Sequence, residues 1–397
     1  LLGINSNLML ILNKKETLGC PEAKRKELRS YFLYSEIKNM TIHHIVNDYN
    51  LAHGGAQRLV LDLHKGGLDA GMCSKLFGLS KDPDYRIKAV RSLKYKNVYQ
   101  FIVMVKLWRY FIEEVNSGDV VHVHLFPAIF YVSILHIFKL IPNCKLILTE
   151  HNTTNNRRNK FWGRIIDYLT YRSYDKIIAI SKGTAEAFLK WKPSVEHKVQ
   201  IINNGAHLTF DNCIVRKQKP TPIIVSVGRL HIQKNYKTAL SAISKIKELN
   251  FKYWIAGVGE LEEELKDQVE RLGLQDKVKF LGYVSDIPSL LKKGDIFLIP
   301  SQWEGFGLAA VEGMNASLPC VVGNVPGLGD LIKEDGEDAF LVAPSDENII
   351  AQRLAQLIKN KKFRHEMGKK AFARSLNFGV DTMIKDYIKL YKEVYDE

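Results

Sequence analysis

Short apolar runs alternate with amphipathic segments along most of the chain after residue 39. Apolar runs of strand length occupy residues 40–46, 74–79, 120–124, 145–149 and 176–180. Between them, apolar residues recur at helical spacing over residues 59–68, 101–115, 129–141, 162–172 and 182–190. Strands that alternate with helices form parallel sheets covered on both faces, so this half of the chain predicts a doubly wound α/β domain.

A second series of the same kind follows a polar stretch that contains Lys217-Gln218-Lys219-Pro220. Its predicted strands cover residues 222–227, 253–256, 279–281, 295–299, 320–322 and 339–342. We expect the following division: a flexible extension (1–39), a first Rossmann-like domain (40–207), a linker (208–221), a second Rossmann-like domain (222–377) and a last amphipathic helix (378–397). Two such domains with ligand loops imply a cleft between them.

The composition is that of a globular protein whose partners are anionic. Of 397 residues, 46% are hydrophobic and 25% charged, and the net charge of +14 favours nucleic acid, an anionic membrane face or phosphorylated substrates. The five cysteines are scattered singly, without a C-x-x-C pair, which predicts a reducing, cytoplasmic setting. No apolar run reaches the ~18 residues of a membrane span, and residues 1–39 lack the pattern of a signal peptide.

The most informative stretch joins a predicted strand to a predicted helix at Glu304-Gly305-Phe306-Gly307, with the helix starting at Leu308. A glycine-bearing turn at a helix N-terminus presents backbone N–H groups and the positive end of the helix dipole, which suits phosphate. The carboxylates of Glu304 and Glu312 would repel phosphate, so they are better suited to accept hydrogen bonds from sugar hydroxyls. For Glu304 alone, the general preference for acidic residues at helix starts explains the pattern equally well.

Candidate cations and polar groups follow other predicted strands. Gly228 ends a strand and is followed by Arg229 and by Lys234, which would offer a planar fork and a point charge to a diphosphate. In the first domain, a Gly54-Gly55 turn follows the first strand, and His124 ends another strand. Ligands in doubly wound folds bind beyond the carboxyl ends of strands, which favours a functional role for His124 over a purely structural one.

These sequence motifs together resemble those of the retaining glycosyltransferases of the GT-B fold, family 4. The resemblance covers roughly residues 40–395 and rests on the paired Glu304 and Glu312, on Gly-Arg-Leu-x-x-x-Lys from Gly228 to Lys234, and on Asp-x-x-His-x-His ending at His124. It implies two Rossmann-like domains facing across a cleft, with the last helix crossing back to the first domain. It also implies a nucleotide-diphosphate sugar donor, UDP- or GDP-linked, and neither a cofactor nor a metal.

The resemblance assigns roles to individual residues. Arg229 and Lys234 would hold the diphosphate and stabilise the leaving group, Glu304 would bind the donor sugar, and His124 would position it; these four are the predicted catalytic residues. Glu312 would bind the ribose. The other predicted donor-binding positions are Gly54, Gly55, Gly228, Gly257, Tyr283, Val284, Gly305, Phe306, Gly307 and Leu308. Glu150, His151 and Asn152 would line the acceptor side, and whether they take part in the chemistry is left open.

The acceptor is predicted to be a saccharide or a lipid-linked saccharide, used for surface polysaccharide or glycolipid synthesis. Residues 155–192 interleave cations with aromatic side chains, which fits either a solvated helix face or docking on an anionic membrane, and therefore peripheral attachment to the cytoplasmic face. Single-stranded nucleic acid would also suit this composition, but no RNA-binding signature accompanies it, so we expect no nucleic-acid partner.

Two alternatives to a transferase remain, an epimerase and a non-catalytic binding protein. A nucleotide-sugar epimerase of the GT-B fold would lack the paired Glu motif and would need further acid–base groups in the cleft. A non-catalytic membrane- or nucleic-acid-binding protein on the same scaffold would have lost Arg229, Lys234 or Glu312, and all three are present.

Overall fold

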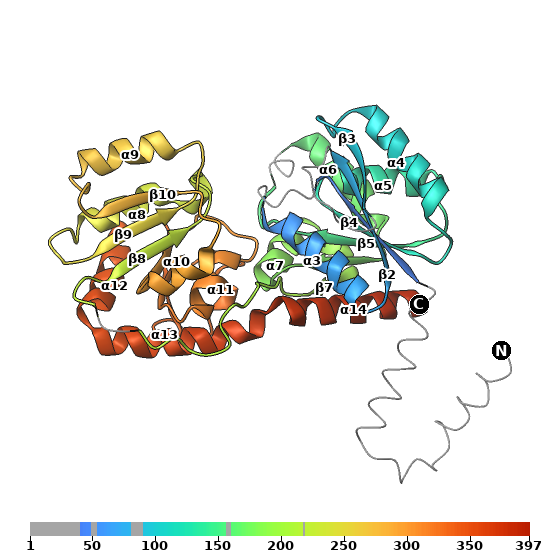
Figure 1. Cartoon of the computed structure of the whole chain (residues 1–397). Helices are drawn as coiled ribbons and strands as arrows, with labels where there is room; N and C mark the ends of the chain where they lie inside the picture. Colours follow the sequence, from blue (N-terminus) through green and yellow to red (C-terminus); the bar gives the residue numbers. More distant parts are fainter. Residues whose placement is uncertain (1–39, 49–53, 81–89, 156–159, 217–218) are drawn as a thin grey trace, which may run out of the picture.

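The computed structural model describes residues 40–48, 54–80, 90–155, 160–216 and 219–397. The chain folds into two lobes, each built on one parallel sheet with helices on both faces (Figure 1). This confirms the predicted α/β class with two doubly wound, Rossmann-like domains. The expected extension over residues 1–39 lies outside the described part of the chain. Among the described helices, none combines the length and apolarity that a bilayer-spanning segment requires.

The N-terminal lobe contains a seven-stranded sheet in the order β3-β2-β1-β4-β5-β6-β7. The strands are β1 (Thr41–Val46), β2 (Cys73–Ser80), β3 (Val90–Tyr95), β4 (Val120–His124), β5 (Lys145–Glu150), β6 (Lys176–Ala179) and β7 (Val199–Ile201). The helices are α3 (Gly55–Asp69), α4 (Phe101–Glu114), α5 (Ala128–Ile137), α6 (Phe161–Arg172) and α7 (Lys182–Trp191). Strands β3 and β7 were not predicted from the sequence; they are the two edge strands and lack a continuous apolar run.

The C-terminal lobe contains a six-stranded sheet in the order β10-β9-β8-β11-β12-β13. The strands are β8 (Ile223–Val227), β9 (Lys252–Ala256), β10 (Val278–Gly282), β11 (Ile296–Ile299), β12 (Cys320–Gly323) and β13 (Ala339–Val342). The helices are α8 (Tyr236–Ser244), α9 (Glu262–Arg271), α10 (Ile287–Lys293), α11 (Leu308–Asn315), α12 (Glu347–Lys359) and α13 (Lys361–Ser375). All strand pairs in both sheets are parallel.

The strand order reverses between β1 and β4 in the first sheet and between β8 and β11 in the second. In open parallel sheets, the chain leaves such a pair of strands in opposite directions and opens a crevice beyond their carboxyl ends. The candidate residues follow these four strands: Gly54 follows β1, His124 ends β4, Gly228 follows β8 and Glu304 follows β11. The topology therefore provides one half of a site on each lobe.

The last helix, α14 (Val380–Asp396), leaves the C-terminal lobe and packs on the N-terminal lobe (Figure 1). Its apolar face buries Tyr387 and Tyr391 against the sheet. The hydroxyl of Tyr391 lies 2.7 Å from Nδ1 of His122 on β4, and that of Tyr387 lies 3.2 Å from Oγ1 of Thr149 on β5. The C-terminal helix thus joins the lobes through polar contacts inside an apolar interface.

Replacing Tyr391 by Phe should lower the free energy of unfolding by about 1–3 kcal/mol, because Nδ1 of the buried His122 loses its partner. Urea denaturation followed by circular dichroism measures this change. The control is Tyr395→Phe on the same helix, since Tyr395 is 39% exposed; its effect should stay within about 0.5 kcal/mol. Equal unfolding curves for the two variants would contradict the assigned contact.

Candidate active site

The loop between β11 and α11 supplies the C-terminal half of the site. Gly307 is the N-cap residue of α11 and has a φ of +99°, and a Cβ there would lie 2.5 Å from Cδ1 of Leu328. The left-handed backbone favours glycine, and a side chain at this position would also displace Leu328. The N-cap glycine has no side chain to cap α11, so among the described residues the first N–H groups of the helix are available to an anion. Phe306 is buried, and its ring packs edge-on against Phe378.

Glu304 and Lys234 form a largely buried ion pair at this loop. Nζ of Lys234 lies 2.5 Å from Oε1 of Glu304, and the hydroxyl of Ser301 donates to the same oxygen at 2.9 Å. Nε2 of Gln233 approaches the other carboxylate oxygen at 3.4 Å. The sequence predicts phosphate as the partner of Lys234 and sugar hydroxyls as the partners of Glu304, but not the contact between the two side chains. The carboxylate therefore orients the ammonium before any ligand binds.

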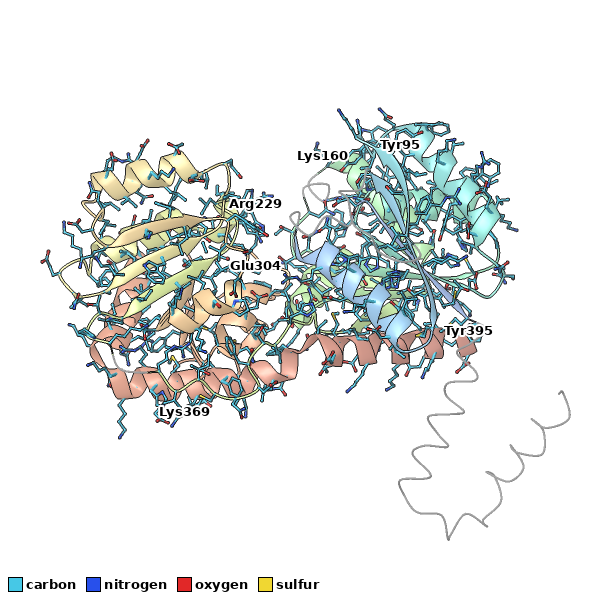
Figure 2. The ribbon with its side chains drawn as sticks, in the orientation of Figure 1. Tyr95, Lys160, Arg229, Glu304, Lys369 and Tyr395 are labelled. Atoms are coloured by element: carbon cyan, nitrogen blue, oxygen red, sulfur yellow. The ribbon has the colours of Figure 1, made fainter. Side chains whose placement is uncertain are left out.

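The turn after β8 is held by close backbone packing. Gly257, which follows β9, has a φ of +145°, and a Cβ there would lie 2.0 Å from the carbonyl oxygen of Gly228. The turn presents Arg229 to solvent, and no residue in the described ranges pairs with its guanidinium. Arg229 and Glu304 both lie on the side of the C-terminal lobe that faces the N-terminal lobe (Figure 2). A free Arg beside an oriented Lys suits a diphosphate.

Tyr283 and Val284 lie beyond β10 and line a pocket of about 580 Å³ between this edge of the sheet and α10. Trp254, Lys279, Leu281, Ser285, Asp286, Ser289, Leu290 and Lys293 complete its wall. The N–H of Gly257 donates to the carbonyl of Gly282 at 2.8 Å, which connects this edge to the turn after β9. Arg229, Lys234 and Glu304 are not part of the pocket wall, so any ligand that uses both regions must be extended.

Glu312 on α11 forms an ion pair across the cleft. Its Oε1 lies 3.1 Å from Nη1 of Arg58 on α3. Burial raises the pKa of Glu312, and Arg58 partly offsets this effect. Nearby, His207 contacts Asp62, and this hydrogen bond raises the pKa of His207. No role was predicted for Arg58 from the sequence. A cation in the first turn of a helix opposes the helix dipole, and this unfavourable position was the signal that could have indicated a function.

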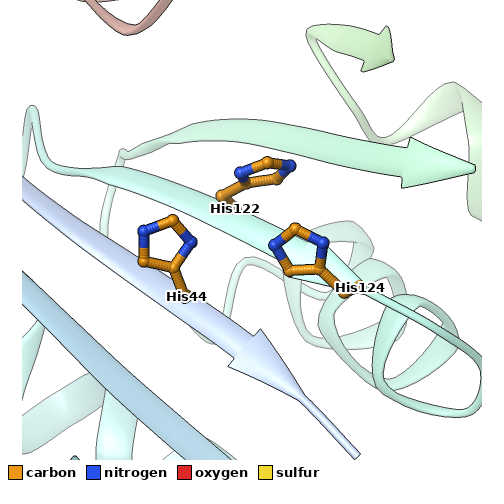
Figure 3. A group of neighbouring side chains, drawn as sticks. All are labelled: His44, His122 and His124. Atoms are coloured by element: carbon orange, nitrogen blue, oxygen red, sulfur yellow. The ribbon is translucent and has the colours of Figure 1, made fainter. Parts of the chain in front are cut away.

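The N-terminal half of the site contains buried, neutral imidazoles. His44 on β1 lies beside His122 and His124 on β4 (Figure 3), and one ring nitrogen from each lies within 4.8 Å of the others. Nδ1 of His124 lies 3.3 Å from Nε2 of His151 at the end of β5. Burial lowers the pKa of His44 and of His151 to about 3 and holds those of His122 and His124 well below the usual value.

The three grouped histidines do not form a ready metal site. Both ring nitrogens of His122 contact hydroxyls, at 2.7 Å from Tyr391 and at 2.7 Å from Thr149. Protein sites for zinc use at least three ligands, so an ion would have to displace one of these hydroxyls. Nδ1 of His44 and Nε2 of His124 are buried and lack a hydrogen-bond partner within the described part of the chain. Nε2 of His124 is therefore better suited to form a hydrogen bond with a ligand hydroxyl than to bind a metal ion.

Direct contacts between the lobes bring the two halves together. A Cβ on Gly305 would lie 2.3 Å from the carbonyl oxygen of His151, so the two backbones touch. The hydroxyl of Ser181, which also caps α7, donates to the carbonyl of Gly305 at 2.8 Å. Thr153 donates to the carbonyl of Glu304 at 3.2 Å. His151 therefore connects His124 to the loop between β11 and α11.

Asp330, whose role the sequence left open, lies at this interface. Its carboxylate accepts a hydrogen bond of 2.5 Å from the N–H of Gly183, in the first turn of α7. A carboxylate at a helix N-terminus is stabilised by the helix dipole. Neither Asp330 nor Thr153 could be assigned from the sequence, because both act across the cleft on backbone groups of the other lobe.

The remaining predicted positions lie around this contact. Gly55 is adjacent to Leu308, since a Cβ on Gly55 would lie 3.1 Å from its Cδ1. The carboxylate of Glu150 is held on both oxygens, by the N–H of Asn152 and by the hydroxyl of Tyr171, each at 3.2 Å. Glu150 is thus anchored by its own lobe, whereas the side chain of Asn152 is exposed.

Comparison with known proteins identifies relatives over most of the chain. Residues 53–210 match the model of the family described as Glycosyltransferase Family 4, and residues 211–374 match that of Glycosyl transferases group 1. An uncharacterized glycosyltransferase of Haemophilus influenzae is 28% identical over 84% of this chain and 95% of its own length. A Campylobacter jejuni α-1,4-N-acetyl-D-galactosaminyltransferase, named for an undecaprenol-linked saccharide, is 28% identical over 63% of this chain and 68% of its own.

The fold is shared with solved glycosyltransferase structures. The crystal structure of Anabaena Alr3699/HepE in complex with UDP superimposes with a TM-score of 0.74 and 20% identity, covering 89% of this chain and 100% of the other. Since the two family models together match residues 53–374 without a break, the chain belongs to the group 1, family 4 glycosyltransferases, which have the GT-B fold.

Proposed function

We propose that this protein transfers a sugar from a nucleotide-diphosphate sugar to a saccharide or lipid-linked acceptor, with retention of the anomeric configuration and without a metal. The observation that carries the proposal is the Lys234–Glu304 pair beside the uncapped N-terminus of α11, with Arg229 in the same cleft and unpaired by any described residue. Positive groups oriented before the reaction stabilise the charge that develops on a leaving diphosphate. The cations and the helix N-terminus supply that charge, so the proposal needs no divalent ion.

The donor would lie along the C-terminal lobe. Its base would occupy the region of Tyr283 and Val284, its ribose hydroxyls would bind Glu312, and its diphosphate would meet Arg229, Lys234 and the first amides of α11. The sugar would then lie between Glu304 and the free Nε2 of His124. The UDP complex of Anabaena Alr3699/HepE and the name of an Escherichia coli relative, a UDP-Gal transferase that is 31% identical over 179 residues, favour UDP as the nucleotide.

The chemistry exchanges one bond at the anomeric carbon for another on the same face. The bond between C1 and the phosphate oxygen breaks, and its electron pair stays with the diphosphate beside Lys234 and Arg229. The acceptor oxygen forms the new bond to C1, and its proton passes to the leaving phosphate oxygen. Glu304 and His124 orient the sugar, and neither has to change its protonation state.

The neutral histidines favour transfer over epimerisation. An epimerase of this fold would need acid–base groups in the cleft that exchange protons near neutral pH. The pKa values of His124 and His151 are held far below that range by burial. Both imidazoles can therefore serve as neutral hydrogen-bonding groups, but they are poor proton acceptors.

The names of two relatives support a role in glycan assembly. The Campylobacter jejuni and Escherichia coli enzymes are named for undecaprenol-linked substrates. We therefore propose a polyprenyl-linked or other membrane-bound saccharide as the acceptor, with the protein working at the cytoplasmic face in surface polysaccharide or glycolipid synthesis. The exposed Asn152, which follows β5, would contact this acceptor.

Replacing Lys234 by Ala should lower kcat/KM for donor turnover by about 10²-fold or more, because the leaving diphosphate loses an oriented cation. Glu304→Gln should lower kcat by about 10- to 100-fold, because it weakens both the sugar contact and the orientation of Lys234. Release of the nucleoside diphosphate reports turnover, after a thermal-shift screen of UDP- and GDP-sugars selects the donor. Lys237→Ala is the control, since this exposed Lys pairs only with Glu264 among the described side chains and should change the rate by less than about twofold. Full activity of Glu304→Gln would refute its assigned role.

Donor binding should weaken as the pH falls, because ribose recognition needs the ionised form of Glu312, whose pKa is raised by burial. Arg58→Ala should raise the pKa of Glu312 further, because the positive charge that offsets the effect of burial is removed. The loss of binding at low pH, the acid limb of the pH profile, should therefore move to higher pH. Titration of the nucleoside diphosphate by calorimetry across the acidic range measures the limb. Glu312→Gln should bind more weakly at all pH values and show no such limb; a limb that persists in this variant would assign it to another group.

A further inference from the structure

Helix α6 presents its apolar side to solvent. Its buried residues are Gly163, Asp167, Thr170 and Tyr171, which are small or polar with the exception of the tyrosine. Its exposed residues include Phe161, Trp162, Ile165, Tyr168 and Leu169, and the first two are 72% exposed. In a helix that serves only to cover a sheet, these faces would be reversed. A contiguous exposed apolar surface of this kind marks an interaction site.

The neighbouring helices extend this surface. Helix α5 packs between α4 and α6, and Nε1 of Trp108 on α4 donates to the carbonyl of Leu140, just after α5. Exposed apolar side chains on this part of the layer are Tyr99, Phe101, Ile102, Trp108, Ile112, Ile137, Phe138 and Leu140. We call the outer surface of α4, α5 and α6 the apolar layer. It holds most of the exposed large apolar residues of the described chain.

The exposed charges on α6 are positive. Lys160 at its N-cap, Arg164 and Arg172 are exposed cations, and the one carboxylate of the helix, Asp167, is buried and accepts a hydrogen bond from Nε1 of Trp191 at 3.1 Å. Cations also stack on the exposed aromatic rings, with the guanidinium of Arg172 lying 4.6 Å from the ring of Tyr168. An exposed surface that combines aromatic rings with exposed cations matches the interface of an anionic bilayer.

We infer that the apolar layer of α4, α5 and α6 inserts into the surface of an anionic lipid bilayer, with Phe161 and Trp162 as its deepest side chains. The buried side of α6 contacts the predicted acceptor side of the cleft, because the hydroxyl of Tyr171 donates to Glu150 at 3.2 Å. The helix that contacts lipid therefore directly supports the predicted acceptor side, which suits an acceptor held in the same membrane. The binding surface does not itself depend on the transfer reaction.

The test is co-flotation of the full chain with vesicles of phosphatidylcholine, either pure or mixed with phosphatidylglycerol. Wild-type protein should float with the mixed vesicles and much less with the pure ones. The double variant Phe161→Ser/Trp162→Ser should partition at least about tenfold less. The matched control is Val215→Ser/Leu376→Ser, which removes two exposed apolar side chains outside the apolar layer and should float like wild type. Circular dichroism checks that both variants are folded.

Three results would overturn the inference. Wild-type protein could fail to float with the mixed vesicles, or the Phe161/Trp162 variant could float as well as wild type. The wild type could also sediment as a dimer that this variant converts to a monomer in the absence of lipid, which would assign the surface to a second copy of the chain. Release of the nucleoside diphosphate is measured separately without vesicles, so failure of the proposed reaction and failure of membrane binding are distinguishable.

Discussion

The backbone contact between Gly305 and His151 fixes how closely the two lobes approach each other. A single added Cβ at Gly305 would lie 2.3 Å from the carbonyl oxygen of His151, which no side-chain rotation can relieve. The same holds at Gly183, where a Cβ would lie 2.2 Å from the nitrogen of Gly327. The hydrogen bond from Gly183 to Asp330 closes this second contact. Since half of the site lies on each lobe, its geometry depends on glycines that carry no chemistry of their own.

The two lobes differ in electrostatic character across this contact. The C-terminal lobe presents Arg229, Lys234 and the positive end of α11, whereas the N-terminal lobe presents imidazoles that burial keeps neutral. In the proposed reaction, a charged leaving group and an uncharged sugar would occupy these two environments at adjacent positions. If His124 were protonated, it would compete with Lys234 for the proposed diphosphate and draw the donor out of position. The burial of the histidines therefore serves the same site as the cations.

The sequence was sufficient to predict the fold class and to place the candidate residues at or after the ends of their strands. The reason is topological: strands of a parallel sheet end on the same edge, so polar residues that follow the apolar runs must gather there. The edge strands β3 and β7 were missed because edge strands do not need to be apolar on both faces. The ion pair between Arg58 and Glu312 and the contacts of Asp330 were missed because they join residues of different lobes. Helix α6 shows a further limit, since its periodicity predicts an apolar face without revealing that this face points outward.

If Glu312 binds the ribose as proposed, its ion pair with Arg58 would link the approach of the two lobes to nucleotide binding. The carboxylate of Glu312 is the predicted partner of the ribose hydroxyls, and in this structure it already bridges to α3 of the other lobe. If the ribose hydroxyls and Arg58 can bind the carboxylate at the same time, ribose binding would favour the closed lobes. If the ribose hydroxyls need both carboxylate oxygens, they would displace Arg58 and favour opening of the lobes. A ligand shifts such an equilibrium only by the difference in its affinity for the two states, so the strength of this ion pair would be one contribution to how far the proposed donor opens or closes the cleft.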